Sequence, residues 1–252
     1  MPAHYDTIGK TYRRARLPDH RIGAVIESRL GACRRILNIG AGAGSYESTA
    51  RQTTALEPSE VMIRQRLETA APAVQGIAEA LPFADNTFDA ATIFLSIHHW
   101  SDWRCGLHEA LRVAQGRLLM FTWIGFPSGF WLTEYFPEII ELDEDLFPTV
   151  TDLEAITGPL IEESIPIPAD CTDGFLCAYW QRPEAYLDPI VRAGMSTFAK
   201  IDNIDERILE LNADLKSGAW DERFGHLRQL DAFDYGYRVL SCGLKGSKEA
   251  GR

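Results

Sequence analysis

The segment Phe88–Leu95 places the strongest constraint on the fold, because it is apolar along almost its whole length. A strand with one face in water alternates apolar and polar residues, whereas a parallel strand covered on both faces is apolar nearly throughout. The surrounding chain alternates between strand-like and helix-like patterns. Strands are predicted at 34–39, 53–56, around Val74, 117–123, 161–167 and around Val239, and helices at 19–30, from Ser45, from Ser59 and at 101–113. This order predicts an α/β fold with a doubly wound, mostly parallel seven-stranded sheet.

The pattern changes after Gly125, where aromatic residues are interrupted by prolines and glycines and a mainly helical stretch follows. We expect a core at 31–125 and, over the carboxyl edge of the sheet, a helical cap at 126–230 that includes the late strand near 161–167. Residues 1–30 are predicted to form an N-terminal helical lid, 231–244 the final strand and 245–252 a disordered tail.

The net charge of −11 argues against a protein that follows a nucleic-acid backbone, because such proteins depend on Lys and Arg. The densest basic stretch, Arg13, Arg14, Arg16 and Arg21, offers little for base recognition. The five cysteines form no Cys-x-x-Cys pair, so we expect neither a metal site nor a disulfide framework. We also expect no secretory signal and no membrane span, and therefore a cytoplasmic protein.

Three glycines follow the strand at 34–39, in the sequence Gly40-Ala-Gly42-Ala-Gly44. Glycine allows a sharp turn and a close approach of the backbone to a ligand where any Cβ would clash. Dinucleotide enzymes use a related loop with the third glycine one place later, and many turns simply require glycine. The loop favours a nucleotide or nucleoside ligand, without settling which.

An acidic residue, Glu57, stands at the end of the next predicted strand. A carboxylate there can accept both hydrogen bonds of a ribose diol. A single Glu could equally be an exposed turn residue, but its distance from the glycine loop is typical of ribose-binding acids. We therefore interpret Glu57 as the ribose ligand.

Together with two later segments, these residues resemble the class I S-adenosylmethionine-dependent methyltransferases, in particular the small-molecule branch similar to the ubiquinone and menaquinone methyltransferases. The later segments are Gly76-Ile-Ala-Glu-Ala-Leu-Pro-Phe83 and Asp85-Asn-Thr-Phe-Asp89. The resemblance covers residues 34–124 and implies a Rossmann-like methyltransferase fold, with S-adenosyl-L-methionine as cofactor and S-adenosyl-L-homocysteine as product. Segments of the C-terminal third, 170–175 and 179–183, look like a bacterial subgroup whose substrate we cannot name.

The resemblance assigns contacts along the whole cofactor, from its methionine end to its adenine. The residues it implies are Asn38, Gly40, Ala41, Gly42, Gly44, Glu57, Pro58, Met62, Ala78, Glu79, Ser96 and Ile97. Two positions depart from the family, which usually has an acid at Asn38 and commonly an Asp at Ile77. Asn38 can still hydrogen-bond the loop or the methionine ammonium, and backbone amides can replace the acid at the adenine.

The N-terminal Tyr5, Tyr12 and Arg16 are implied to close over the site, as in related enzymes. An aromatic ring suits the sulfonium and a guanidinium suits the carboxylate, so Tyr12 and Arg16 are expected at the cofactor and Tyr5 at the substrate. An amphipathic surface helix with its tyrosines packed inward is the alternative.

His98 and His99 are the candidates for a general base, because imidazole titrates near neutral pH. They follow the strand at 88–95, where doubly wound folds place their ligands. Adjacent side chains cannot both face the pocket well, so we expect one of them, with His99 preferred, to act on the substrate. The alternative is that a histidine only packs there or caps the next helix.

Aromatic residues of the cap could form a pocket for a flat substrate, although such residues also commonly fill a core. The substrate-binding candidates, in addition to Tyr5, are Trp100, Trp123, Phe126, Trp131, Tyr135, Asp170 and Asp173. We predict methyl transfer to O, N or C of a small aromatic or heterocyclic metabolite, by a monomer or homodimer that binds neither nucleic acid nor membrane. The alternatives are a non-catalytic S-adenosylmethionine-binding protein and a nicotinamide-dependent oxidoreductase.

Overall fold

The structure, a computed structural model, describes residues 16–144 and 146–243. Its main sheet has seven strands in the order β3-β2-β1-β4-β5-β9-β6. The strands are β1 (Arg35–Ile39), β2 (Gln52–Glu57), β3 (Ala73–Gln75), β4 (Phe88–Phe94), β5 (Ala114–Trp123), β6 (Ile161–Ser164) and β9 (Tyr237–Gly243). Strand β9 is antiparallel to both of its neighbours, β5 and β6, and the other pairs of adjacent strands in this sheet are parallel. The predicted α/β fold with a mostly parallel seven-stranded sheet is confirmed.

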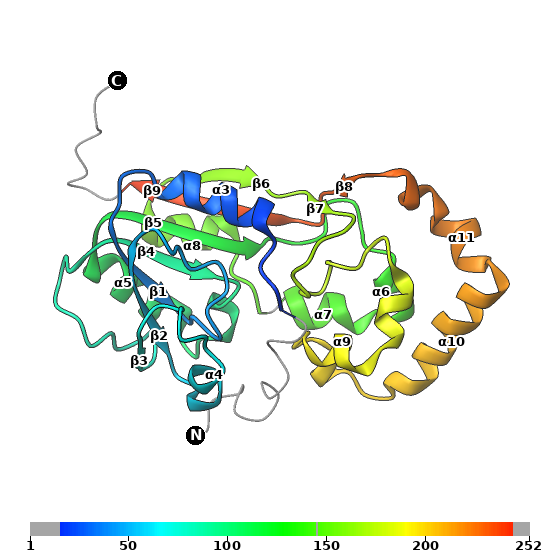
Figure 1. The fold of residues 1–252 in the computed structure, drawn as a ribbon. Coiled ribbons are helices and arrows are strands. Elements are labelled where there is room, and N and C mark those ends of the chain that lie inside the picture. Colours follow the sequence, from blue (N-terminus) through cyan, green and yellow to red (C-terminus); the bar gives the residue numbers. More distant parts are fainter. Residues whose placement is uncertain (1–15, 145, 244–252) are drawn as a thin grey trace.

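Helices cover both faces of the sheet, as the apolar pattern of its central strands requires (Figure 1). In β5, Leu119 and Phe121 join α3 (His20–Leu30) in one hydrophobic cluster, whereas Leu118 and Met120 join α5 (Trp103–Val113) and α8 (Val150–Thr157) in another. Successive side chains of a strand point to opposite faces, so one apolar strand supplies both clusters. A further short helix, α4 (Glu60–Arg64), follows β2.

The helix predicted from Ser45 is absent, and residues 41–51 form turns instead. Gly40, Gly42, Gly44 and Tyr46 all have positive φ, of 69°, 53°, 100° and 59°. Four left-handed positions within seven residues are incompatible with a right-handed helix. The prediction counted the glycines as a turn but did not extend the turn through Tyr46.

Two other boundaries differ from the prediction. Asp102, and not Ser101, caps α5, because its carboxylate accepts a hydrogen bond from the Cys105 amide at 3.0 Å. The single strand expected at 161–167 is divided: Pro166 has no amide hydrogen to continue the ladder. After it, β7 (Ile167–Pro168) pairs with β8 (Ala232–Phe233) in a separate two-stranded sheet.

The cap lies beyond the carboxyl ends of β4 and β5 (Figure 1). It contains α6 (Leu132–Tyr135), α7 (Glu138–Glu144), α9 (Pro189–Ala193), α10 (Ile204–Ser217) and α11 (Ala219–Phe224), with short 3-10 turns at 183–187, 198–200 and 225–229. Its core is continuous with the cluster under α3, so cap and sheet share one hydrophobic interior. Within the described residues, no helix has the length and apolarity needed to cross a bilayer.

Of the expected N-terminal lid, the structure describes residues 16–30. The helix α3 packs on the sheet beside β5 and β9, and Arg16 reaches toward the carboxyl edge. Tyr5, Tyr12 and the tail at 245–252 lie outside the described residues.

Candidate active site

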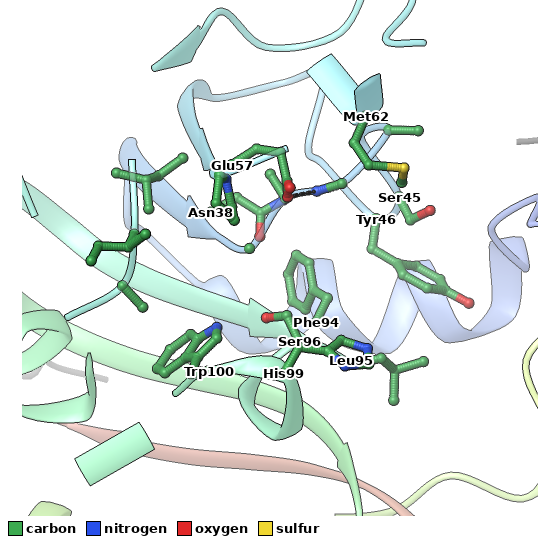
Figure 2. Close-up of a pocket in the computed structure, with 18 of the residues that line it drawn as sticks. Asn38, Ser45, Tyr46, Glu57, Met62, Phe94, Leu95, Ser96, His99 and Trp100 are labelled. Atoms are coloured by element: carbon green, nitrogen blue, oxygen red, sulfur yellow. Dashed lines mark hydrogen bonds between the residues drawn. The ribbon is translucent and has the colours of Figure 1, made fainter. Parts of the chain in front are cut away.

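A cavity of about 420 Å³ opens at the carboxyl ends of β1, β2 and β4 (Figure 2). It lies where the chain order across the sheet reverses between β1 and β4, which is the usual ligand position in open α/β sheets. Most of the predicted cofactor contacts line it: Arg16, Asn38, Gly40, Ala41, Gly42, Glu57, Pro58, Met62, Ala78, Glu79 and Ser96. The structure thus brings residues from five separate segments to one cavity.

Gly40 cannot carry a side chain in this arrangement. A Cβ built on it would lie 2.6 Å from the Cβ of Ser96 and 2.7 Å from the Ser96 hydroxyl. Ser96 is held in place because its hydroxyl donates to the Ile39 carbonyl at 2.8 Å. This close approach follows from the parallel pairing of β1 with β4, which brings the residues after both strands together.

Gly44, a predicted cofactor contact, is not among the residues that line the cavity, although Ala43 and Ser45 on either side of it are. A Cβ at Gly44 would lie 3.3 Å from Glu47, 3.4 Å from Ala70 and 3.5 Å from Arg66. Its small size therefore makes room for a buried ion pair behind the loop.

Glu57 lies at the end of β2, next to the glycine loop, because β1 and β2 pair in parallel with Ile39 opposite Leu56. Its side chain is buried, and its two oxygens accept hydrogen bonds from the Gly42 amide at 2.8 Å and the Ser59 amide at 2.9 Å. A carboxylate oxygen can accept more than one hydrogen bond. The backbone thus holds Glu57 in one orientation while it lines the cavity.

The other end of the cavity is more apolar and is lined by Ile77, Ala78 and Trp100. Glu79 also lines it, but one of its oxygens accepts from the Ser101 hydroxyl at 2.8 Å and the Asp102 amide at 3.0 Å. Burial acts to raise the pKa of Glu79, but these hydrogen bonds prevail and hold it below its usual value. Glu79 therefore anchors the start of α5 as well as bordering the cavity.

A second, smaller chamber of about 60 Å³ lies between this cavity and the cap. Its walls include the aromatic side chains of Trp123, Phe147, Phe175 and Tyr237, together with His98 and Thr197. Arg16, Leu95 and His99 line both spaces. These three residues therefore form the boundary between the two. His98 and His99 both line the smaller chamber, whereas the sequence predicted that only one of them would face a pocket.

Leu95 adopts a left-handed conformation at this boundary, with φ of 48°. Non-glycine residues rarely do so, and such strain costs on the order of 1–3 kcal/mol unless the surroundings enforce it. The hydrogen bond from the Leu95 amide to the Phe121 carbonyl, at 2.8 Å, holds it there. The strained turn directs the chain from β4 into the 3-10 turn Ile97–His99.

His98 stacks on Phe147, with ring centroids 4.1 Å apart, and against His99, at 3.8 Å. Its Nδ1 is buried without a hydrogen-bond partner among the described residues. Burial, and then electrostatic interactions with His99, Lys200 and Arg16, keep the pKa of His98 well below 6.5. His98 is therefore a neutral imidazole at neutral pH.

We expect the free energy of unfolding to decrease between about pH 7.5 and pH 5.5, and to decrease less in His98→Phe. The unfolded His98 titrates near 6.5 and the folded one well below it, so the unfolded state binds more protons as the pH falls. Acidification should thus favour unfolding by roughly 1 kcal/mol through this residue. Urea unfolding at both pH values measures the difference. Equal pH dependence in wild type and variant would contradict the expectation.

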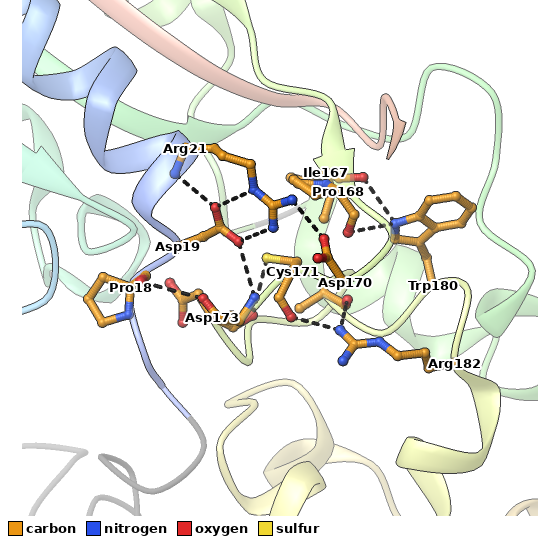
Figure 3. A network of polar contacts seen from close by, with 12 residues as sticks. Pro18, Asp19, Arg21, Ile167, Pro168, Asp170, Cys171, Asp173, Trp180 and Arg182 are labelled. Atoms are coloured by element: carbon orange, nitrogen blue, oxygen red, sulfur yellow. Dashed lines mark hydrogen bonds and ion pairs between the residues drawn. The ribbon is translucent and has the colours of Figure 1, made fainter. Parts of the chain in front are cut away.

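A network of polar contacts joins the N-terminal segment, the glycine loop and a turn of the cap. Asp173 is fully buried; its carboxylate contacts the Arg16 Nε at 2.5 Å and accepts from the Tyr46 hydroxyl at 2.8 Å. Figure 3 shows the adjoining part, where the carboxylate of Asp19 accepts from the Arg21 side chain at 2.6 Å and from the Thr172 amide at 3.2 Å. Arg16 and Tyr46 line the larger cavity, so this network forms part of its wall.

Several predicted contacts are corrected by their positions. Trp131 and Tyr135 are buried in the cap core, where Trp131 donates to the Trp180 carbonyl at 2.7 Å and Tyr135 to Asp214 at 2.6 Å. Asp170 is exposed and pairs with Arg21. An aromatic side chain can fill a core or line a pocket equally well. In this small cap, Trp131 and Tyr135 fill the core.

Three further predicted contact residues line neither of the two spaces. Phe126 packs against Trp123 at 4.7 Å between centroids, Ile97 is buried in the hydrophobic cluster that includes α5, and Asp173 belongs to the network with Arg16. Sequence reasoning missed a set of residues that contact or support the two spaces: Tyr46, Glu47, Leu95, Phe147 and Phe175. Only the first three carry a local signal: Tyr46 and Glu47 come just after the glycine loop, and Leu95 is the last residue of a predicted strand.

A cavity at the carboxyl edge of a parallel sheet, bordered by a glycine loop and a buried carboxylate, defines a Rossmann-like nucleoside-binding protein. The family model of the methyltransferase domain matches residues 37–120. A solved structure from Anabaena variabilis, described as a methyltransferase from an antibiotic biosynthesis pathway, is 31% identical with a TM-score of 0.85; the alignment covers 91% of this chain and 99% of that one. The chain belongs to the class I S-adenosylmethionine-dependent methyltransferases.

Curated relatives match a shorter part of the chain. The demethylmenaquinone methyltransferase of Renibacterium salmoninarum is 33% identical over 122 residues, which is 45% of this chain and 49% of the relative. The ubiquinone/menaquinone biosynthesis C-methyltransferase of Roseobacter denitrificans is 36% identical over 113 residues, 38% of this chain and 45% of the relative. The chain thus spans about half the length of the curated relatives it matches. The family resemblance predicted from the sequence is confirmed.

Proposed function

We propose that the protein transfers a methyl group from S-adenosylmethionine to O, N or C of a small aromatic or heterocyclic metabolite. The observation that carries this proposal is that two spaces of different character meet at Arg16, Leu95 and His99. The larger suits a nucleoside with an amino-acid arm. The smaller, of about 60 Å³, is too small for a whole ring, but its aromatic walls suit contact with the edge of a flat acceptor that extends from the larger space. The relatives' names, which refer to quinone precursors, agree with a planar acceptor.

The residues of the larger cavity fit the cofactor by their chemistry. Glu57 can accept from the ribose hydroxyls, and Ile77, Ala78 and Met62 offer an apolar surface for the adenine. Asn38 has a buried oxygen, Oδ1, without a partner among the described residues, as a donor-bearing ligand would require. When bound, the cofactor supplies an activated methyl group on a sulfonium.

The chain's own part in the reaction is to orient the acceptor and exclude water. The aromatic walls would hold the edge of the acceptor ring, and the boundary residues would set the direction from which it meets the cofactor. His99 lies at this boundary, and we assign to it the role of a general base for acceptors that must lose a proton. His98, neutral and with Nδ1 unpartnered among the described residues, would hydrogen-bond the acceptor.

The same proposal includes the kind of acceptor, the location of the protein and its oligomeric state. We propose that the acceptor is a small molecule and that the protein acts in the cytoplasm, as a monomer or homodimer, on neither nucleic acid nor a membrane surface. The net charge of −11 supports this, because a polyanion would be repelled.

Isothermal calorimetry with S-adenosylmethionine, S-adenosylhomocysteine and NAD tests the cofactor assignment. We expect both sulfur-containing nucleosides to bind and NAD not to bind. Tight binding of NAD together with no response to either nucleoside would overturn the proposed function.

Glu57→Ala should weaken S-adenosylhomocysteine binding by roughly 1–3 kcal/mol, because the ribose hydroxyls and the amides of Gly42 and Ser59 lose their acceptor. Glu60→Ala is the matched control, since Glu60 is exposed on α4 and pairs with Arg64. Calorimetry on the three proteins measures the effect. Equal affinity in wild type and Glu57→Ala would remove Glu57 from the ribose site.

A further inference from the structure

Asn38, at the carboxyl end of β1, is only 1% exposed and lines the larger cavity. Its amide nitrogen Nδ2 donates to the carboxylate of Glu47 at 3.2 Å. Its amide oxygen Oδ1 is buried with no partner among the described residues. The nitrogen of the Asn38 side-chain amide therefore has a hydrogen-bond partner, whereas its oxygen has none among the described residues.

Glu47 does not line the cavity; it lies behind the glycine loop in a buried ion pair with Arg66. The side chains of Glu47 and Arg66 are 6% and 5% exposed, and Arg66 Nη2 contacts both carboxylate oxygens, at 2.7 and 2.6 Å. Arg66 also donates to the Gly42 carbonyl at 3.0 Å, and the Ala71 amide donates to Glu47 at 3.1 Å. Contacts from three directions leave the carboxylate little freedom to move.

We infer that Glu47 is a positioning residue that fixes the Asn38 amide, so that Oδ1 accepts a hydrogen bond from the primary ammonium of the cofactor's amino-acid arm. The inference rests on the proposed function, because it concerns the same cavity. An ionised carboxylate only accepts hydrogen bonds, whereas an amide has one donating and one accepting end. Turning the Asn38 amide over would place two oxygens in contact, so Glu47 permits a single orientation.

The unpartnered oxygen identifies the chemistry of the ligand group. A buried acceptor without a donor is costly, and a ligand that supplies a donor removes that cost. An ammonium is a donor with no accepting atom, so it matches Oδ1 and not Nδ2. A carboxylate has the opposite preference, and the orientation imposed by Glu47 turns the donating end of Asn38 away from it.

An aspartate at position 38 would be unsuitable while Glu47 is present. It would place a second carboxylate oxygen beside that of Glu47 in a buried site, and neighbouring buried like charges disfavour each other. The same aspartate should be tolerated when residue 47 is a glutamine, because the glutamine amide can donate to it. If the aspartate is tolerated only with the glutamine, Glu47 acts by orienting the side-chain amide of residue 38. A residue that only supports the glycine loop would not show this dependence.

The test is calorimetry with two ligands, S-adenosylhomocysteine and its deaminated analogue, which keeps the carboxylate and lacks only the ammonium. In Glu47→Gln, residue 47 can donate or accept, so Asn38 is no longer oriented. We expect affinity for S-adenosylhomocysteine to fall about fivefold to tenfold, with affinity for the deaminated analogue within about twofold of wild type. Glu60→Gln, at the exposed pair with Arg64, should change neither.

Asn38→Asp should lose about tenfold or more in affinity for S-adenosylhomocysteine, and Asn38→Asp combined with Glu47→Gln should recover to within about threefold of wild type. Thermal unfolding of each variant shows which proteins remain folded, and Asn38→Asp with its rescue provides a second route if Glu47→Gln does not fold. Rescue, or a loss confined to the ligand that carries an ammonium, supports the inference. Equal losses for both ligands in Glu47→Gln, or wild-type affinity in Asn38→Asp, would overturn it while leaving the proposed function intact. A wild-type protein that binds neither ligand would overturn both.

Discussion

Asp173→Ala should lower the free energy of unfolding by about 3–5 kcal/mol, because it removes a buried carboxylate that contacts both a guanidinium and a buried hydroxyl. Asp173 has no exposed surface, and its partners Arg16 and Tyr46 come from the N-terminal segment and the glycine loop. Burial, and then the charge of Asp173, raise the pKa of Tyr46, so the Tyr46 hydroxyl stays protonated and continues to donate. Urea unfolding followed by tryptophan fluorescence measures the change.

Asp170→Asn is the matched control, three residues away in the same turn of the cap (Figure 3). Asp170 pairs with Arg21 at 2.7 Å, but its side chain is 81% exposed. Water screens an exposed ion pair, so this variant should remain close to wild type in stability. Equal stability of the Asp173 and Asp170 variants would show that burial of the Arg16 pair does not stabilise the fold.

Gly40→Ala should lower the free energy of unfolding by roughly 3 kcal/mol and weaken S-adenosylhomocysteine binding at least about tenfold. Two effects add at this position: an unfavourable φ of 69° for a residue with a side chain, and a contact of 2.6 Å with the Ser96 Cβ. Ser96 cannot move away easily, because its hydroxyl is bonded to the Ile39 carbonyl. Any shift would displace residues on both sides of the cavity.

Gly129→Ala separates the two effects. Gly129 has a similar φ of 74°, but a Cβ built there meets nothing within 4 Å. The variant should lose only about 1–2 kcal/mol from backbone strain and bind S-adenosylhomocysteine as wild type does. Chemical unfolding and calorimetry on both variants test this. If Gly40→Ala loses no more stability than Gly129→Ala, the close contact with Ser96 does not contribute to the loss of stability.

These variants address two different ways in which the site is held together. The glycine loop, Glu57 and Ser96 are neighbours because parallel strands of one sheet end at the same edge. Arg16, Tyr46 and Asp173 are neighbours only because the cap folds back over that edge. The first arrangement depends on the pairing of strands within the sheet and the second on the packing of the cap against it.

The amino-acid sequence alone was sufficient for the central fold and for much of the larger cavity. An apolar strand such as Phe88–Phe94 has a recognisable local pattern, and glycines and an acid after successive strands must meet at one sheet edge. The positions of Gly40, Gly42 and Glu57 at the cavity follow from this geometry. These predictions used the order of the strands and the family resemblance, and they did not need the packing of the cap.

Only the tertiary structure decided which of the remaining candidates reach the two spaces. Trp123 lines the smaller chamber whereas Trp131 fills the cap core, although both are tryptophans in the same aromatic-rich region. Arg16 and Asp173 pair across 157 positions, an interaction that no local pattern contains. The physical reason is that an apolar side chain can be buried, and a charged one can find a partner, at several positions in a fold. The packing of the cap against the sheet determines which of these positions each side chain takes.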